Sequence, residues 1–355
     1  MHIPDGYLSP ASCATLYATS APFWYVALRR MKRLLNTQVV PLLAVFAAFS
    51  FVIMMFNLPL PGGTTGHAVG VSIAAIVLGP WGAILSISIA LMIQAVFFGD
   101  GGITAIGANC FNMAIAGSLV AYAIYRIISG RVAIDSPRRI VAAGIAGYVA
   151  INVSALFAAI EFGIQPMLYR DATGAPLYAP YPLHIAIPAM MIGHLTIAGL
   201  AEMVVSGGVV AYLQRAEPGL LRRTAPGAAG SVEVPATGWR KTRPLWTALA
   251  LLMILTPLGI LAAGSAWGEW SPEDFHDQAI RTQIATASGN LAPPMEAPTG
   301  LRKLSTFWTA PMPRYAPPFL KSPAVGYVLS AMAGTGMIIL AFLSLAWITS
   351  RRATE

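Results

Sequence analysis

The first two residues, Met1 and His2, offer a set of nitrogen atoms that can bind a divalent metal ion. The donors are the terminal amine, the backbone nitrogen of His2 once it has lost its proton, and Nδ1 of the His2 ring. Binding through all three closes a five-membered and a six-membered chelate ring, with the donors nearly in one plane. A histidine at position two therefore fills three corners of a square and leaves the fourth open. Planar nitrogen coordination favours Ni(II) or Cu(II) over Zn(II), Mg(II) or Mn(II).

His67 is the natural candidate for the fourth corner of this square. It follows the glycine-rich run 61–66, which we expect to form an outer loop at the entrance to a helix. Three residues near the start disfavour a helix there and so let the N-terminus fold back toward this loop: Pro4, Gly6 and Pro10. From these residues alone, His2 could equally be part of a mobile end and His67 an ordinary loop histidine.

The elements that must position these residues are membrane-spanning helices. The sequence is 56% hydrophobic and 10% charged, with a mean hydropathy of +0.67, whereas a soluble domain is about 45 to 50% apolar and roughly 25% charged. Several apolar blocks approach the roughly 20 residues that cross a hydrocarbon layer as a helix. We therefore predict an all-α polytopic membrane protein with nine spans: about 11–30, 38–58, 66–78, 83–98, 103–125, 140–163, 183–213, 245–264 and 323–349. The third and fourth form a hairpin turned by residues 79–82.

The distribution of charge predicts the orientation of these spans. Most of the 22 lysines and arginines fall on one side of the predicted membrane, which the positive-inside rule makes the cytoplasm. The N-terminus is then outside and the C-terminus cytoplasmic, in a multi-pass protein of the inner cell membrane. The start lacks a basic and then apolar signal sequence, so we expect the encoded N-terminus to survive. Cys13 and Cys110 are expected to be buried free thiols.

The chain divides at a cytoplasmic linker, residues 215–243, whose prolines and glycines indicate flexibility. Residues 1–214 hold seven of the predicted helices and residues 244–355 hold two. Between those two lies a proline-rich external segment, 265–322. Four acidic residues near its start can attract cations by their summed field: Glu269, Glu273, Asp274 and Asp277. We therefore expect 244–349 to affect transport more than metal binding.

Four short motifs resemble the metal-binding subunit of energy-coupling factor (ECF) transporters for nickel and cobalt. They lie in the expected order over about residues 1–214, at 1–10, 62–67, 97–102 and 107–113. Residues 244–349 resemble the small two-helix companion subunit of the same systems, here fused to the chain. The companion's acidic signature is reduced to Ser271 to Phe275.

The resemblance implies a site, a cargo and partners. The ion is Ni(II) or Co(II), transported as substrate, and the protein has no cofactor of its own; the Ile-Pro-Asp-Gly start slightly favours nickel. The implied ligands are Met1, His2 and His67, and the residues implied to hold the N-terminal loop and imidazole in place are Asn109, Asn112 and Asp100. The two asparagines could instead bond between helices. The implied partners are a membrane coupling subunit and cytoplasmic ATPases.

Three further residues are candidates for chemistry: Glu202, His194 and His276. An acid at membrane depth is a functional candidate, so a proton- or cation-driven secondary transporter that uses His194 and Glu202 is the main alternative function. A metal sensor or structural membrane protein is a third class. The sequence contains no Gly-Lys pair for a P-loop and no His-Glu-x-x-His motif. We therefore predict that the chain is not an enzyme and takes its energy from partner subunits.

Overall fold

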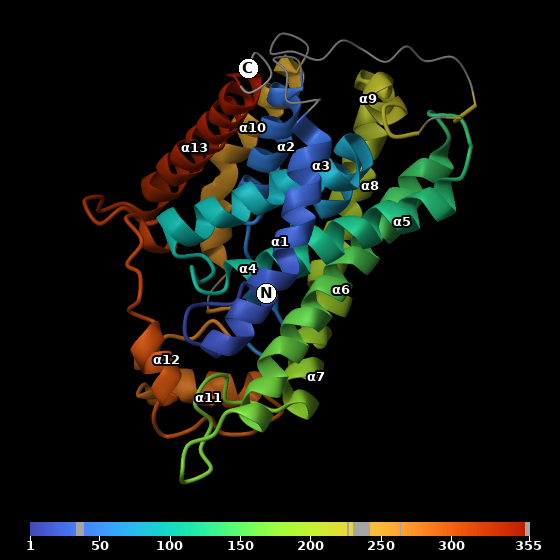
Figure 1. Ribbon diagram of the computed structural model, residues 1–355. Coiled ribbons are helices and arrows are strands. Elements are labelled where there is room, and N and C mark those ends of the chain that lie inside the picture. The colour runs from blue at the N-terminus through green and yellow to red at the C-terminus, as the bar shows by residue number, and fades with distance from the viewer. Residues whose placement is uncertain (33–38, 226, 230–241, 263, 352–355) are drawn as a thin grey trace.

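The computed structural model describes residues 1–32, 39–225, 227–229, 242–262 and 264–351. In this part of the chain the fold is a helical bundle with one two-stranded sheet (Figure 1). Up to residue 222 the helices are α1 (Pro10–Lys32), α2 (Val40–Ile53), α3 (Val71–Ile93), α4 (Ile106–Asn109), α5 (Ser118–Ser129), α6 (Pro137–Leu168), α7 (Leu183–Gly193), α8 (Gly199–Ala216) and α9 (Pro218–Arg222). From residue 243 onward they are α10 (Arg243–Leu255), α11 (Gln278–Ala287), α12 (Thr299–Leu304) and α13 (Pro323–Arg351).

Among the described residues, six helical segments are long and apolar enough to cross a membrane. They are Val71–Phe98, Ile106–Ser129, Pro137–Leu168, Leu183–Ala216, Arg243–Leu261 and Pro323–Thr349. The predicted class, an all-α polytopic membrane protein, is confirmed. The number of nine spans and the orientation of the two termini remain predictions.

The segment from residue 71 to 98 folds back on itself at Gly79. This glycine has φ 76° and ψ 167° inside α3, a backbone conformation that residues with a Cβ atom rarely adopt. A straight helix of this length would place its two ends about 40 Å apart. Instead His67 and Asp100, which flank the segment, both contact His2. The break lies inside the turn predicted at residues 79–82.

Two predicted helices around the glycine-rich loop have the wrong bounds. The helix expected over 38–58 ends at Ile53, and residues Leu58–Leu60 form strand β1, which pairs antiparallel with strand β2, Thr64–Gly66. The helix expected from residue 66 begins only at Val71. Prolines and glycines between the two helices cannot sustain a helix, and the short hairpin satisfies the backbone there. His67 therefore lies directly after a strand.

Other boundaries shift where the helical geometry changes. The span predicted over 103–125 begins with the short α4, continues as a π-helical stretch over Cys110–Gly117 and ends as α5. The span predicted over 183–213 is likewise interrupted by a π-helical turn over His194–Ala198. The span predicted over 245–264 becomes 3₁₀-helical at Thr256, next to a proline. Such π-helical insertions are often found at functional sites.

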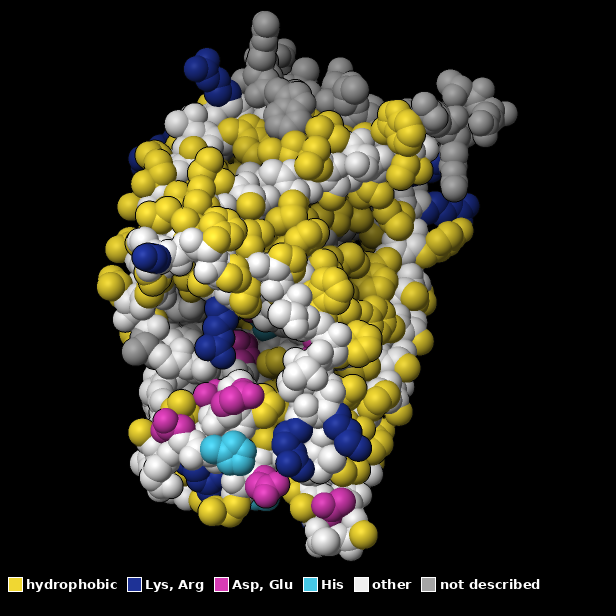
Figure 2. All heavy atoms as spheres, turned by 90° about the vertical axis from the view of Figure 1, so that its left-hand side faces the viewer, with side chains coloured by type: hydrophobic (Ala, Val, Ile, Leu, Met, Phe, Trp, Pro, Cys, Tyr) yellow, Lys and Arg dark blue, Asp and Glu magenta, His cyan; other side chains and the backbone are white. Residues whose placement is uncertain are grey.

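The proline-rich segment 265–322 is an ordered cap that contains α11 and α12. In Figure 1 these helices lie at one end of the bundle, beside the end of α7. Figure 2 shows charged and histidine side chains gathered on this end, below a broad hydrophobic surface. Of the predicted linker 215–243, the structure contains α9, while residues 226 and 230–241 lie outside the described part of the chain.

Candidate metal centre

The N-terminus is buried inside the molecule. Met1 is 3% exposed, His2 1% and Ile3 0%, and Figure 1 shows the terminus among the helices. Asn109, at the end of α4, holds Ile3 from both sides: the Ile3 N–H donates to Oδ1 of Asn109 (2.8 Å), and Nδ2 of Asn109 donates to the Ile3 carbonyl (3.1 Å). Asn109 therefore contacts the N-terminal loop on both sides of Ile3.

The next residues of the N-terminal loop are held by Asp5. Its carboxylate accepts hydrogen bonds from the N–H groups of Ile103 (3.1 Å) and Thr104 (2.7 Å) and from the Thr104 hydroxyl (2.5 Å). Gly102 donates to the Ile3 carbonyl at 2.8 Å. A Cβ on Gly102 would lie 2.2 Å from the backbone nitrogen of Asp5, so only glycine permits this close approach of the two loops.

The two histidine rings lie against each other. The ring centroids of His2 and His67 are 5.1 Å apart and the planes meet at 83°. Nδ1–H of His67 donates to the carbonyl of Ala68 (3.1 Å), which leaves Nε2 as the unprotonated nitrogen of the neutral ring. Burial, together with the positive charges on His2 and the terminal amine, lowers the pKa of His67 to about 3. The neutral ring is the form of histidine that binds metals.

His2 pairs with Asp100, which in turn is held by the C-terminal part of the chain. His2 Nδ1 lies 2.9 Å from Oδ1 of Asp100, and the Tyr315 hydroxyl donates to Oδ2 of Asp100 at 2.5 Å. Gln94 donates to the Tyr315 oxygen (2.9 Å) and lies within reach of Asp100 (3.4 Å). Burial opposes ionisation of both partners, but the pairing outweighs it, so the pKa of His2 is raised and that of Asp100 is lowered.

The terminal amine also pairs with the C-terminal part of the chain. The Met1 amine lies 3.2 Å from Oε1 of Glu269. Beside it, the Tyr7 hydroxyl donates to the carbonyl of Trp270 at 2.8 Å. Trp267 and Trp270 stack edge to face at 5.6 Å and pack with aromatic rings of the seven-helix part: Phe162 and Tyr181.

Sequence reasoning missed the roles of Glu269, Tyr315 and Gln94. Glu269 was counted only as one of several external acids, and nothing in the sequence marked the other two. Glu269 lies 268 positions from Met1 and Tyr315 lies 215 positions from Asp100. No spacing rule connects residues that far apart.

Asn112 corrects the expectation that both asparagines hold the N-terminal loop. Its Nδ2 donates to Oε2 of Glu161 on α6 at 2.8 Å, and its carbonyl accepts from the Ser154 hydroxyl. Asn112 therefore bonds between helices, as the alternative interpretation had it.

Glu202 and His194 both have structural partners. Oε2 of Glu202 accepts from the N–H groups of Val69 (2.7 Å) and Gly70 (3.0 Å), at the N-terminus of α3, where backbone N–H groups lack helical partners. Nδ1 of His194 lies 2.8 Å from the carbonyl oxygen of Met190. It also lines a small cavity together with Met1. His276 is exposed at the surface of the cap.

Among the described residues, no three side chains of His, Cys, Asp or Glu are arranged to hold a metal ion. Nε2 of His2 is buried and has no hydrogen-bond partner within the described part of the chain.

Comparison with known protein families shows which family the chain belongs to. The family described as the cobalt uptake substrate-specific transmembrane region matches residues 2–220, more than half of the sequence. The chain belongs to this family. The PDGLE domain matches residues 241–351.

Relatives share the fused arrangement. The chain is 56% identical over 339 residues to the fused nickel transport protein NikMN of Rhodobacter capsulatus, covering 96% of this chain and 95% of the relative. It is 42% identical over 343 residues to the probable fused nickel transport protein LarMN of Lactiplantibacillus plantarum, covering 96% of each. A crystal structure described as a transition metal transporter is 48% identical and covers 65% of this chain and 100% of its own, with a TM-score of 0.58. The resemblance to a fused metal-binding and companion subunit is confirmed.

Proposed function

We propose that this chain is the substrate-specific membrane component of an ECF transporter and captures Ni(II) or Co(II) at the outer face for ATP-driven uptake. The proposed ligands are the Met1 amine, the backbone nitrogen and Nδ1 of His2, and the ring of His67. The observation that carries the proposal is the burial of Met1 and His2 against His67, with the two rings 5.1 Å apart. A mobile end would not be held this way.

Capture is an exchange of partners. In the structure, the Met1 amine pairs with Glu269 and Nδ1 of His2 pairs with Asp100. Nitrogen donors must lose their protons to bind a metal, so each nitrogen leaves a carboxylate for the ion. The two carboxylates then lie near a divalent charge and compensate for its burial.

The choice between the two metals rests on geometry and relatives. Planar nitrogen donors favour nickel, and the two fused relatives named above are called nickel transport proteins. The matching family is described by cobalt uptake. We favour nickel slightly; uptake of the two labelled ions in competition measures the preference.

The division of labour follows the two parts of the chain. Residues 1–214 bind the ion, 215–243 link the parts, and 244–355 form the companion unit with its external cap. The N-terminus lies outside and the C-terminus in the cytoplasm, in agreement with the positive-inside rule. A membrane coupling subunit and cytoplasmic ATPases supply the energy, because the sequence has no P-loop lysine motif.

The decisive experiment changes the terminal amine. One residue added before Met1 moves the amine away and turns the Met1 nitrogen into an amide, so Ni(II) affinity of the purified protein should fall more than a hundredfold, or about 2.8 kcal/mol. One residue added at the C-terminus is the matched control. Spectroscopic titration measures the affinity, and thermal unfolding checks that the fold is intact. Undiminished binding by the N-terminally extended protein contradicts the tridentate site.

A second pair of variants tests the fourth ligand. His67→Ala should lose binding to a degree similar to His2→Ala. His184, exposed at the start of α7, provides the control, and His184→Ala should bind as the unchanged protein does. Equal losses from His67 and His184 would place the ion elsewhere.

A further inference from the structure

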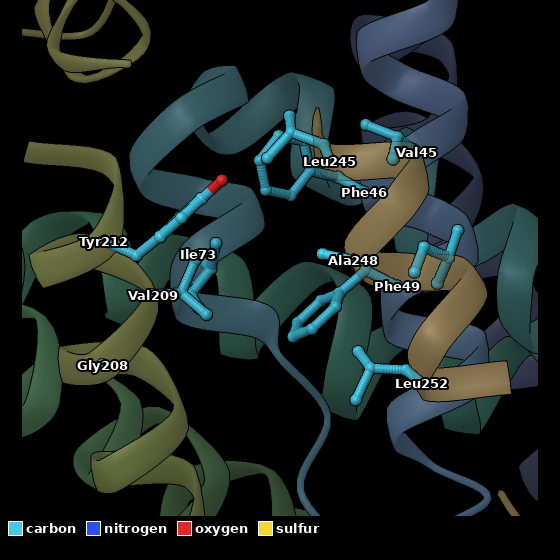
Figure 3. Close-up of a pocket in the computed structure, with 11 residues that line it drawn as sticks. Val45, Phe46, Phe49, Ile73, Gly208, Val209, Tyr212, Leu245, Ala248 and Leu252 are labelled. Carbon is cyan, nitrogen blue, oxygen red and sulfur yellow. The ribbon is translucent and has the colours of Figure 1, made fainter. Parts of the chain in front are cut away.

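An apolar groove lies between the seven-helix part and the companion unit. It has a volume of about 240 Å³ and is lined by Val45, Phe46, Phe49, Ile73, Gly208, Val209, Tyr212, Leu245, Ala248, Leu249 and Leu252. Figure 3 shows these side chains extending from α2, α3, α8 and α10 toward a shared space. None of the proposed metal ligands lines the groove.

One end of the groove lies close to one surface of the membrane. α10 begins at Arg243, and its lining residues run from Leu245 to Leu252, a rise of about 10 Å. α2 begins at Val40, only a little more than one turn before the first of its lining residues. The groove therefore runs from near the start of α10 to about the middle of α2, a depth that the acyl chains of lipids occupy.

The rim of the groove on this side is polar and positively charged. The Tyr212 side chain reaches from α8 across the groove, with its hydroxyl at the tip (Figure 3). Arg215 follows three residues later on the same face of α8, and Arg243 lies two residues before Leu245. Both arginines are exposed, and the ion pairs found in the described part of the chain involve neither of them.

We propose that this groove binds one anionic phospholipid, with an acyl chain along the apolar walls and the phosphate at Tyr212, Arg215 and Arg243. An apolar channel open to the bilayer gains dispersion contacts when hydrocarbon fills it. Guanidinium groups pair with phosphate through charge-assisted hydrogen bonds, and anionic membrane surfaces attract basic residues. A lipid here bridges the two parts of the chain. An apolar partner helix would need no cationic rim.

Gly208 offers a way to fill the groove without disturbing the fold. A Cβ at Gly208 would meet no atom within 4 Å, and the same is true of Gly336 on α13, away from the groove. The variant is Gly208→Leu and the matched control is Gly336→Leu. Arg215→Gln tests the rim separately.

The measurement is native mass spectrometry of the full chain released from bilayers with equal amounts of phosphatidylglycerol and phosphatidylcholine. We expect the unchanged protein and the Gly336→Leu control to retain one phosphatidylglycerol. Gly208→Leu should reduce its occupancy at least fivefold, and Arg215→Gln should remove the preference over phosphatidylcholine. Equal retention by Gly208→Leu and the control overturns the proposal, as does equal retention of both lipids by the unchanged protein. If Gly208→Leu leaves lipid unchanged and only blocks assembly with the coupling subunit, the groove is a protein-docking site instead.

Discussion

At the scale of single residues, carboxylates and amides hold the proposed nitrogen donors in place. Asp100 orients the His2 ring and is itself oriented by Tyr315 and Gln94. Carboxylates that bond to metal-binding histidines in this way fix the ring orientation and commonly change metal affinity when removed. Asn109 fixes the backbone of Ile3 through two hydrogen bonds. These contacts restrict the N-terminal loop, so the terminal amine loses little conformational freedom when it binds a metal ion.

The two asparagines of one motif should behave differently. Asn109→Ala removes both bonds to Ile3, so Ni(II) affinity should fall about 10- to 100-fold. Asn112→Ala leaves Glu161 without its amide partner, which should destabilise the fold by about 1 to 3 kcal/mol and leave affinity nearly unchanged. Titration and thermal unfolding of the two purified variants separate these effects. Similar affinity losses from both would show that Asn112 supports the site as well.

At the scale of secondary-structure elements, three elements that meet near His67 fix its position. The β1 and β2 hairpin ends one residue before it, the N-terminus of α3 begins four residues after it, and α8 supplies Glu202 to the N–H groups of Val69 and Gly70. A carboxylate at a helix N-terminus is favoured by the helix dipole. Glu202 thus anchors the loop that carries the fourth proposed ligand.

Variants of Glu202 distinguish this anchoring role from proton relay. Glu202→Ala leaves two buried N–H groups without a partner, at about 1 to 3 kcal/mol each, so the melting temperature and metal affinity should both fall. Glu202→Gln keeps an acceptor oxygen and should retain most binding and uptake. The control is Glu296→Gln, at an exposed ion pair with Arg302. Loss of uptake in Glu202→Gln with binding intact would instead favour the proton-driven secondary transporter.

At the scale of the whole molecule, the companion unit is part of the site's surroundings. Its cap brings Glu269 to the Met1 amine, Trp270 to Tyr7 and Tyr315 to Asp100. Sequence reasoning predicted that residues 244–349 would affect transport more than metal binding. The contacts change this expectation, because the unit orients two of the proposed donors.

Deleting residues 244–349 should therefore weaken Ni(II) binding by about 10- to 100-fold and lower ATP-dependent uptake more strongly. Residues 1–243 and 244–355 produced as two separate chains provide the control, since the contacts can then form without the covalent link. Affinity and uptake are compared after assembly with the same partner subunits. Unchanged affinity in the deletion would show that the cap contacts contribute nothing to binding.

The sequence by itself determined the properties of the protein that depend on local chemistry and on composition. The proposed donor set follows from the order of Met1 and His2, the membrane fold follows from apolar block length, and the turn near Gly79 follows from a Gly-Pro pair. These properties need no distant partner. The same local reasoning misplaced the ends of the helices beside His67, because pairing of residues 58–60 with 64–66 competes with helix there.

Only the tertiary structure decided which distant side chains meet the N-terminus. Asn109 and Asn112 lie three positions apart in one motif, yet one faces Ile3 and the other Glu161. Glu269 and Tyr315 reach the site from the far end of the chain. Such contacts arise from packing of helices and cap around a shared core, where burial compels each polar group to find a partner. A single sequence records which groups need partners, but their identity is set by the arrangement of the whole chain in space.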